Sequence, residues 1–165
     1  MSARSLVAGA LAAGLGACAG TGGGAPTATT LDSAGFAVCP WAGEGPRLVD
    51  VHDQAGFGAF LAQAQLEVPR VAGWKPDFRH DRVVLVMPEP RSSAGYRAEW
   101  IEAALAGGQL RAHVEVRPPA SGEMAATVIS QPCVAAWVRA PGAREVEIIN
   151  ADNGEVMLRS APAQR

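Results

Sequence analysis

Runs and alternations of apolar residues divide the chain into predicted elements. Residues 83–87 (Val-Val-Leu-Val-Met) are apolar without interruption, which is typical of a strand covered on both faces. Residues 133–138 have the same character and predict a second central strand. Between these runs, apolar and polar residues alternate through residues 109–117, which indicates a strand with one buried face.

The last part of the chain predicts a hairpin. Two apolar runs, residues 146–149 and residues 156–158, flank the sequence Asp152-Asn153-Gly154. An Asn-Gly pair between two apolar runs is the strongest short signal for a tight turn between antiparallel strands. Residues 48–51 add a further short strand near the start of the folded part.

One helix is predicted directly after that short strand. Asp53 has the side chain of a helix N-cap and precedes a stripe of apolar residues at helical spacing. The stripe consists of Phe57, Phe60, Leu61 and Ala64. Two glycines, Gly56 and Gly58, interrupt it and each cost up to about 1 kcal/mol relative to alanine. The helix is therefore expected to depend on packing rather than on intrinsic propensity.

Residues 96–105 leave two alternatives open. Tyr96, Trp100 and Ala104 have helical spacing, whereas Gly107-Gly108 followed by a clear strand favours a β-hairpin. The sequence as a whole predicts an α+β fold: a mostly antiparallel β-sheet of five or six strands with one N-terminal helix. A length of 165 residues is consistent with a single domain.

The N-terminus has the pattern of a targeting segment. Arg4 precedes ten apolar or small residues, too few to span a bilayer, and Leu15-Gly16-Ala17-Cys18 resembles the lipobox of bacterial lipoproteins. Residues 1–17 are accordingly predicted to be a lipoprotein signal peptide, with Cys18 as the lipidation site. An ordinary secretory signal followed by a chance cysteine is the alternative.

The predicted lipoprotein signal sets the organisation and the location expected of the mature protein. Residues 18–35, rich in Gly, Thr and Ala, are predicted to be a flexible tether, and residues 36–160 the folded domain. By analogy with such lipoproteins, Ala19 after the cysteine favours sorting to the outer membrane. The expected location is the cell envelope, facing the periplasm or the surface, and the lipid on Cys18 makes the membrane a partner.

Charge and motifs narrow the function classes. A net charge of −2 gives no excess of basic residues of the kind that nucleic-acid-binding proteins use, so that class is not expected. No metalloprotease, nucleophile-elbow or Cys-x-x-Cys motif occurs, and the faint leads for an enzyme are His52, His80 and Ser121. We therefore expect no catalytic residues, no metal site and no cofactor.

The cysteines suggest a structural bond. If Cys18 carries lipid, Cys39 and Cys133 remain as an even pair in an oxidising compartment. A disulfide between them is one interpretation. Two buried free thiols are the other, because free cysteine packs as a small apolar residue.

Two loops are the candidate binding elements. Residues 88–96 and residues 118–124 both leave the ends of predicted strands and are rich in Pro and Gly. The alternative is that both loops are plain connections. The candidate binding residues are Arg91, Ser93, Gly95, Tyr96, Pro119, Gly122 and Met124.

The order of these features resembles the C-terminal domain of the PrcB family of protease complex subunits. That family has an Asp-Phe pair before an apolar strand, a Thr-Gly-Gly-Tyr turn, a hairpin, a Pro-rich loop with Gly and Met, and a Pro-led apolar strand. The corresponding segments here are Asp77-Phe78, Ser93-Ala94-Gly95-Tyr96, residues 109–117, residues 119–124 and Gln131-Pro132-Cys133-Val134. Ser93 and Ala94 depart from the family turn. The resemblance covers about residues 78–140 and favours a strand after Tyr96.

The resemblance implies a non-catalytic accessory subunit that assembles with a secreted or surface protease. A weaker similarity links the Gly-Tyr turn to the wedge of chagasin-type cysteine-protease inhibitors, and predicts an inhibitor that uses the Ser93 to Tyr96 turn as the alternative. An enzyme and a purely structural envelope protein are the other classes.

Overall fold

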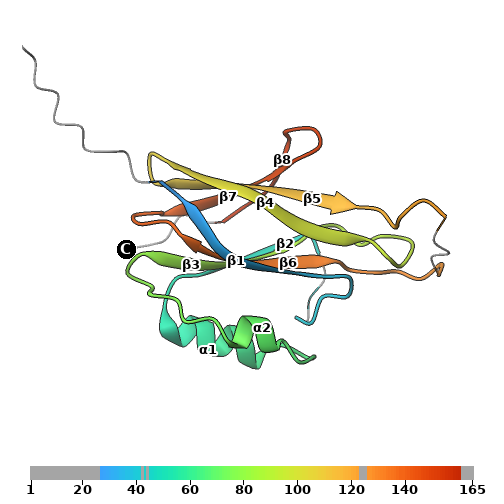
Figure 1. Ribbon diagram of the computed structural model, residues 1–165, viewed down its shortest axis with the longest axis horizontal. Coiled ribbons are helices and arrows are strands. Elements are labelled where there is room, and N and C mark those ends of the chain that lie inside the picture. The colour runs from blue at the N-terminus through green and yellow to red at the C-terminus, as the bar shows by residue number, and fades with distance from the viewer. Residues whose placement is uncertain (1–26, 42, 44, 123–125, 161–165) are drawn as a thin grey trace, which may run out of the picture.

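Two four-stranded sheets pack face to face, and two short helices cover the outer face of one sheet (Figure 1). The computed structural model describes residues 27–41, 43, 45–122 and 126–160. The elements in chain order are β1 (Thr29–Phe36), β2 (Arg47–Val51), α1 (Gln54–Ala62), α2 (Pro69–Ala72), β3 (Asp81–Met87), β4 (Arg97–Ala106), β5 (Gln109–Arg117), β6 (Cys133–Arg139), β7 (Glu145–Asn150) and β8 (Val156–Arg159).

The strands divide into one sheet with the order β1-β6-β3-β2 and another with the order β4-β5-β7-β8. Every neighbouring pair is antiparallel except β5 and β7, which run parallel. The predicted α+β class and the mostly antiparallel pairing are confirmed. The predicted count of five or six strands is wrong, because the described residues form eight strands in two sheets.

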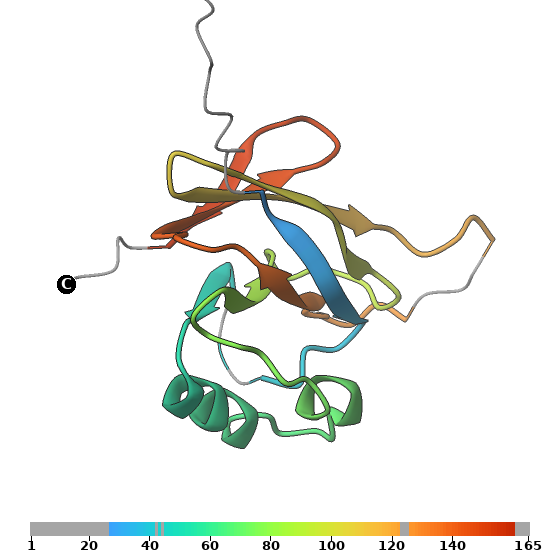
Figure 2. The ribbon, with the colours of Figure 1, turned by 60° about the vertical axis from the view of Figure 1, so that its left-hand side comes forward.

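Strand β3 lies at the centre of the three layers, which explains its uninterrupted apolar sequence. Val84 and Val86 face the core between the two sheets. Val83, Leu85 and Met87 face the helices instead. Strand β6 is covered in the same way, with Val134, Ala136 and Val138 on the inter-sheet side. Both predictions of a central strand are confirmed, and Figure 2 shows the helices on one side of this sheet and the second sheet on the other.

The predicted helix is confirmed as α1. Asp53 caps it, because its Oδ1 accepts a hydrogen bond from the Gly56 amide at 2.6 Å. Phe57 and Phe60 are the buried residues, and the Phe60 ring stacks on Trp41 with ring centroids 4.5 Å apart. A second helix, α2, was not predicted. It is one turn long and begins with Pro69, a residue that favours the first turn of a helix.

Residues 97–106 form strand β4, which resolves the alternatives left open by the sequence. Ala98, Trp100 and Leu105 are buried, but an irregularity in the β4–β5 register between Trp100 and Glu102 shifts the alternation by one residue. That shift hides the period of two in this segment. The turn to β5 is made by Gly107 and Gly108, both with positive φ, as a tight hairpin requires.

Part of the predicted tether is folded. Residues 29–35, assigned to the tether from sequence, form most of β1 and pair along β6. Trp100 Nε1 donates to Thr30 Oγ1 at 2.9 Å, and a Cβ on Gly35 would lie only 2.7 Å from the Ala98 carbonyl oxygen. Thr30 and Gly35 thus allow β1 to approach β4 closely. Residues 1–26, including Cys18, lie outside the described residues.

A disulfide joins Cys39, just after β1, to Cys133 at the start of β6. The prediction of this bond is confirmed, and the alternative of two free thiols is wrong. Cys133 is fully buried in the core beneath the helices.

Candidate functional site

Both predicted binding loops lie at one end of the sandwich. The β5–β6 loop reaches this end, because β6 starts here directly after it. The β3–β4 loop starts at the same end, because β3 runs antiparallel to β6 and therefore ends where β6 starts. Strands β5 and β7 are parallel and also end here. Figure 1 shows the β5–β6 loop at the right-hand end, whereas β1 starts at the left. We call this right-hand end the loop end.

Hydrogen bonds join the two loops to each other. Arg91 and Ser130 form an isolated antiparallel bridge, in which each backbone amide donates to the other residue's carbonyl, at 2.8 and 2.9 Å. The Ser130 hydroxyl also donates to the Ser93 carbonyl oxygen at 2.6 Å. Further along, the Ala94 amide donates to the Ala126 carbonyl oxygen at 2.9 Å. The loops therefore form one braced surface rather than two independent connections.

Gly95 allows the two loops to approach each other closely at Pro119. Its φ is +89°, and a Cβ at this position would lie 3.0 Å from Cγ of Pro119. The structure thus brings together Arg91, Ser93, Gly95, Tyr96 and Pro119. Gly122 lies in the same loop, with a φ of +91° and open space around it. The remaining candidate, Met124, lies outside the described residues.

We predict that Gly95→Ala destabilises the domain more than Gly122→Ala. Both substitutions force alanine into a backbone region that costs about 1–2 kcal/mol, but only the Gly95 methyl group also meets a neighbouring ring. The extra loss is expected to be about 1 kcal/mol. Urea unfolding of the two variants measures it, and equal losses would show that the Gly95–Pro119 contact contributes nothing.

Arg91 is held between the loops by its side chain as well as its backbone. Its guanidinium carbon lies 5.5 Å from the centroid of the half-buried Tyr96 ring, within the range of a cation–π contact. The Arg91 Nε atom is buried and has no hydrogen-bond partner in the part of the chain that the structure describes.

Sequence reasoning missed an exposed apolar pair on the same surface. Val128 and Ile129 precede Ser130 in the β5–β6 loop, and their exposed fractions are 52% and 84%. The sequence did contain a signal for them, because two adjacent β-branched residues occur there outside any predicted strand. Exposed aliphatic side chains beside an arginine and a tyrosine are typical of protein-binding surfaces.

A cavity of about 310 Å³ opens at the loop end, and nothing in the sequence predicted it. Its walls come from three segments that are distant in sequence: the residue before β2, the β3–β4 loop and the β7–β8 hairpin. Its lining residues are Pro46, Pro88, Glu89, Arg91, Asn150, Glu155, Val156, Met157 and Leu158.

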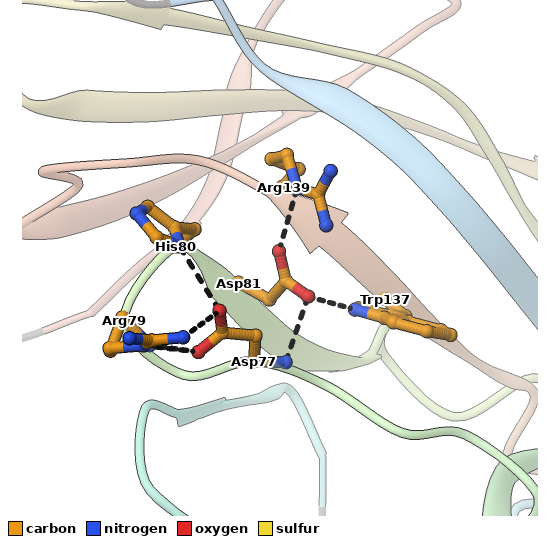
Figure 3. Close-up of polar contacts among 6 residues, drawn as sticks. All are labelled: Asp77, Arg79, His80, Asp81, Trp137 and Arg139. Carbon is orange, nitrogen blue, oxygen red and sulfur yellow. Dashed lines mark hydrogen bonds and ion pairs between the residues drawn. The ribbon is translucent and has the colours of Figure 1, made fainter.

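The opposite end of the sandwich holds a polar network around Asp81 (Figure 3). Asp81 is 1% exposed and accepts hydrogen bonds from Trp137 Nε1 at 2.9 Å, Arg139 Nε at 3.1 Å and the Asp77 amide at 3.0 Å. Hydrogen bonds from Arg79 hold the pKa of the exposed Asp77 carboxyl well below its ordinary range. These contacts tie the start of β3 to the end of β6, so the network is structural.

The faint catalytic leads do not come together. His80 contacts Asp77 at 3.2 Å at the Asp81 end of the sandwich, and His52 follows β2 at the same end. Ser121 lies at the loop end. Among the described residues, no group of three or more potential metal ligands is gathered, and no helix is long and apolar enough to cross a membrane.

A half-buried ion pair makes stability depend on pH. Asp50 Oδ2 lies 3.0 Å from Arg82 Nη1, and each side chain is 13% exposed. Burial raises the pKa of the Asp50 carboxyl above its ordinary value of 3.8, although the charges of Arg82 and His52 act in the opposite direction. The second oxygen, Oδ1, has no hydrogen-bond partner among the described residues.

We predict that Asp50→Asn removes a pH-dependent cost. Between pH 3.8 and the raised folded-state pKa, the folded state binds more protons than the unfolded state, so the free energy of unfolding falls as pH rises. The variant lacks this dependence on pH. Its free energy of unfolding should therefore rise relative to that of the native protein as the pH increases from 3.8 to the raised pKa. Urea unfolding from pH 3.5 to pH 7 measures the difference. A difference in the free energy of unfolding that stays constant with pH would contradict a raised pKa for Asp50.

The fold and its loop end define a class of protein: a β-sandwich with a helical cover and with two hydrogen-bonded loops braced against each other at one end. Residues 82–139 match the family model described as PrcB C-terminal. The resemblance drawn from the sequence is thereby confirmed for this segment, which runs from β3 through β6 and includes both candidate loops. No curated protein and no solved structure matches the chain.

Proposed function

We propose that this protein is a non-catalytic accessory subunit of a surface protease complex, held in the cell envelope by lipid on Cys18. The observation that carries the proposal is the PrcB C-terminal match, which spans the two loops that meet at the loop end. A role in a protease-associated complex follows from that family. The lipid anchor, the location and the absence of catalysis are further parts of the proposal.

The position of β1 supports this arrangement. Thr29 pairs with Arg139 at the end of β6, whereas the loop end lies at the start of β6, about 20 Å away for a strand of this length. A chain anchored through Cys18 would therefore enter the domain far from the loops. The loop end would face away from the membrane, where a large partner could reach it.

Site-specific crosslinking tests the partner. A photoreactive amino acid replaces Ile129 in the full-length chain expressed in its own cells, and irradiation is followed by purification and mass spectrometry. The control replaces Leu66, which is 56% exposed on the helical side of the domain. We expect a protease to be crosslinked from position 129 and not from position 66. Crosslinking of no protease from position 129, or equally from both, would contradict the proposal.

The anchor and the inhibitor alternative have separate tests. Cys18→Ser should leave the precursor uncut or release the protein from the membrane fraction, and mass spectrometry of the native N-terminus should find an acylated cysteine.

For the alternative function, the protein is titrated against papain-like and subtilisin-like proteases. Inhibition at micromolar concentrations would favour the chagasin-like role of the Ser93 to Tyr96 turn over the accessory role.

A further inference from the structure

We propose that the cavity beside Arg91 binds a carboxylate group of an extended peptide. This inference rests on the proposed function, since it specifies the chemistry by which the loop end would hold a protein partner. It does not depend on that partner being a protease.

The state of Arg91 is the first observation. Seven other arginines of the domain form ion pairs with carboxylates. Arg91 forms none among the described residues, although Glu89 and Glu155 line the same cavity. Its Nε is buried and has no hydrogen-bond partner among the described residues, so a ligand in the cavity would meet the terminal Nη atoms instead. A planar guanidinium matches a carboxylate in bidentate geometry. Arg91 thus carries a charge for which the described residues supply no carboxylate.

The rigidity of Arg91 is the second observation. Its backbone amide and carbonyl both form hydrogen bonds with Ser130, and its side chain lies over the Tyr96 ring. The guanidinium therefore loses little freedom when it binds a ligand. A preorganised charged group of this kind contributes more to affinity than a mobile surface arginine.

The remaining lining residues favour a peptide over a small anion. Glu89 and Glu155 are both exposed, and their charges would repel a free anion but would pair with amino groups of a larger ligand. Pro88, Met157 and Leu158 supply apolar wall for a side chain. A volume of about 310 Å³ lies at the lower end of the range of ligand sites, which suits one end or one short segment of a peptide.

Strand β8 offers hydrogen bonds for the peptide backbone. Val156, Met157 and Leu158 are consecutive residues of β8, Glu155 directly precedes them, and neighbouring residues of a strand point to opposite faces. A cavity that contacts all four must run along the edge of β8 rather than over one face. β8 is the last strand in the order of its sheet. An extended peptide could therefore pair with this edge while its carboxylate reaches Arg91.

Peptide binding to the full-length protein in detergent tests the inference. Three dye-labelled probes share the sequence Gly-Lys-Ala-Leu-Val: one with a free C-terminal carboxylate, one amidated, and one amidated with Glu in place of Ala. We expect at least one carboxylate probe to bind ~10-fold more tightly than the amidated probe. The free-terminus and Glu probes distinguish a terminal from a side-chain carboxylate. Equal anisotropy titrations for all three probes would overturn the inference.

Variants assign the binding to Arg91. Arg91→Gln should weaken the preferred probe ~10-fold. Arg91→Lys should give an intermediate loss of affinity, because lysine keeps the positive charge but cannot form the two parallel hydrogen bonds of a guanidinium. Arg97→Gln is the matched control, since Arg97 is exposed, lies nearby on β4 and does not line the cavity. Undiminished binding by Arg91→Gln, or an equal loss in Arg97→Gln, would overturn the assignment.

Two further measurements keep the inference testable if Arg91→Gln folds poorly. Met157→Trp fills the cavity without touching the charge and should also weaken binding ~10-fold. In the native protein, the NMR signal of the Arg91 Nε–H should shift when the preferred probe is added, and an unchanged signal would overturn the inference. A protease crosslink from position 129 without peptide binding would leave the proposed function standing. Peptide binding that depends on Arg91, without that crosslink, would support the peptide site and contradict the proposed function.

Discussion

Replacing both Cys39 and Cys133 by alanine is expected to lower the free energy of unfolding by roughly 4 kcal/mol. The bond joins residues 94 positions apart, so it removes a large part of the freedom of the unfolded chain. It also holds the end of β1 and the start of β6 together beside the loop end. Urea unfolding of the native protein and the double variant measures the loss.

Reduction provides the control for this prediction. In a buffer with excess reductant, the native protein should lose nearly the same stability. The double variant should not respond to the reductant, and a small residual difference between the two proteins would report the packing of the buried Cys133 sulfur. A native protein that unfolds at the same urea concentration in oxidising and reducing buffer would contradict the prediction.

Asp81→Ala is expected to cost about 3 kcal/mol of stability. The substitution removes a buried carboxylate that accepts three hydrogen bonds, and it leaves the Trp137 Nε1 and Asp77 amide donors without their acceptor. Arg139 loses an ion pair too, but its side chain is 53% exposed and water replaces that partner. Thermal and urea unfolding measure the effect.

Graded variants separate the parts of this loss. Asp81→Asn keeps one acceptor oxygen and should cost about half as much, whereas Trp137→Phe removes one donor and should cost about 1 kcal/mol. Asp152→Ala, at an exposed position in the β7–β8 turn, is the control and should change little. A loss below about 1 kcal/mol for Asp81→Ala would contradict a structural role for the network.

These two predictions concern opposite ends of the same strand. Cys133 fixes the start of β6 at the loop end, and Arg139 and Trp137 fix its far half through Asp81. Because β6 is central to its sheet, both attachments hold the scaffold from which the β5–β6 loop emerges. The candidate binding surface is thus supported by the core and not only by contacts between the loops.

Several elements were predictable because their signal is local. The uninterrupted apolar runs of β3 and β6 require cover on both faces, and the structure supplies it with helices on one side and a second sheet on the other. Asp53 caps α1 through an atom three residues away. The β7–β8 hairpin was likewise predicted from one turn and the two runs beside it.

Other elements were not predictable, because alternation shows which faces are buried but not which strands pair. The division into two sheets, the parallel β5–β7 pair and the strand β1 depend on contacts between distant segments. Strand β4 was ambiguous since its bulge interrupts the period of two. The candidate loops could be named from Pro and Gly content, but their contacts through Ser130 and Pro119 could not.

The sequence by itself therefore determined the central strands, the capped helix, the hairpin and the two loops, since each depends on neighbouring residues. It left the disulfide between Cys39 and Cys133 as one of two interpretations, which the structure decided. Only the tertiary structure decided that these loops meet at one end and that a cavity forms beside Arg91. Its walls come from three segments that are far apart along the chain, so only their packing creates it.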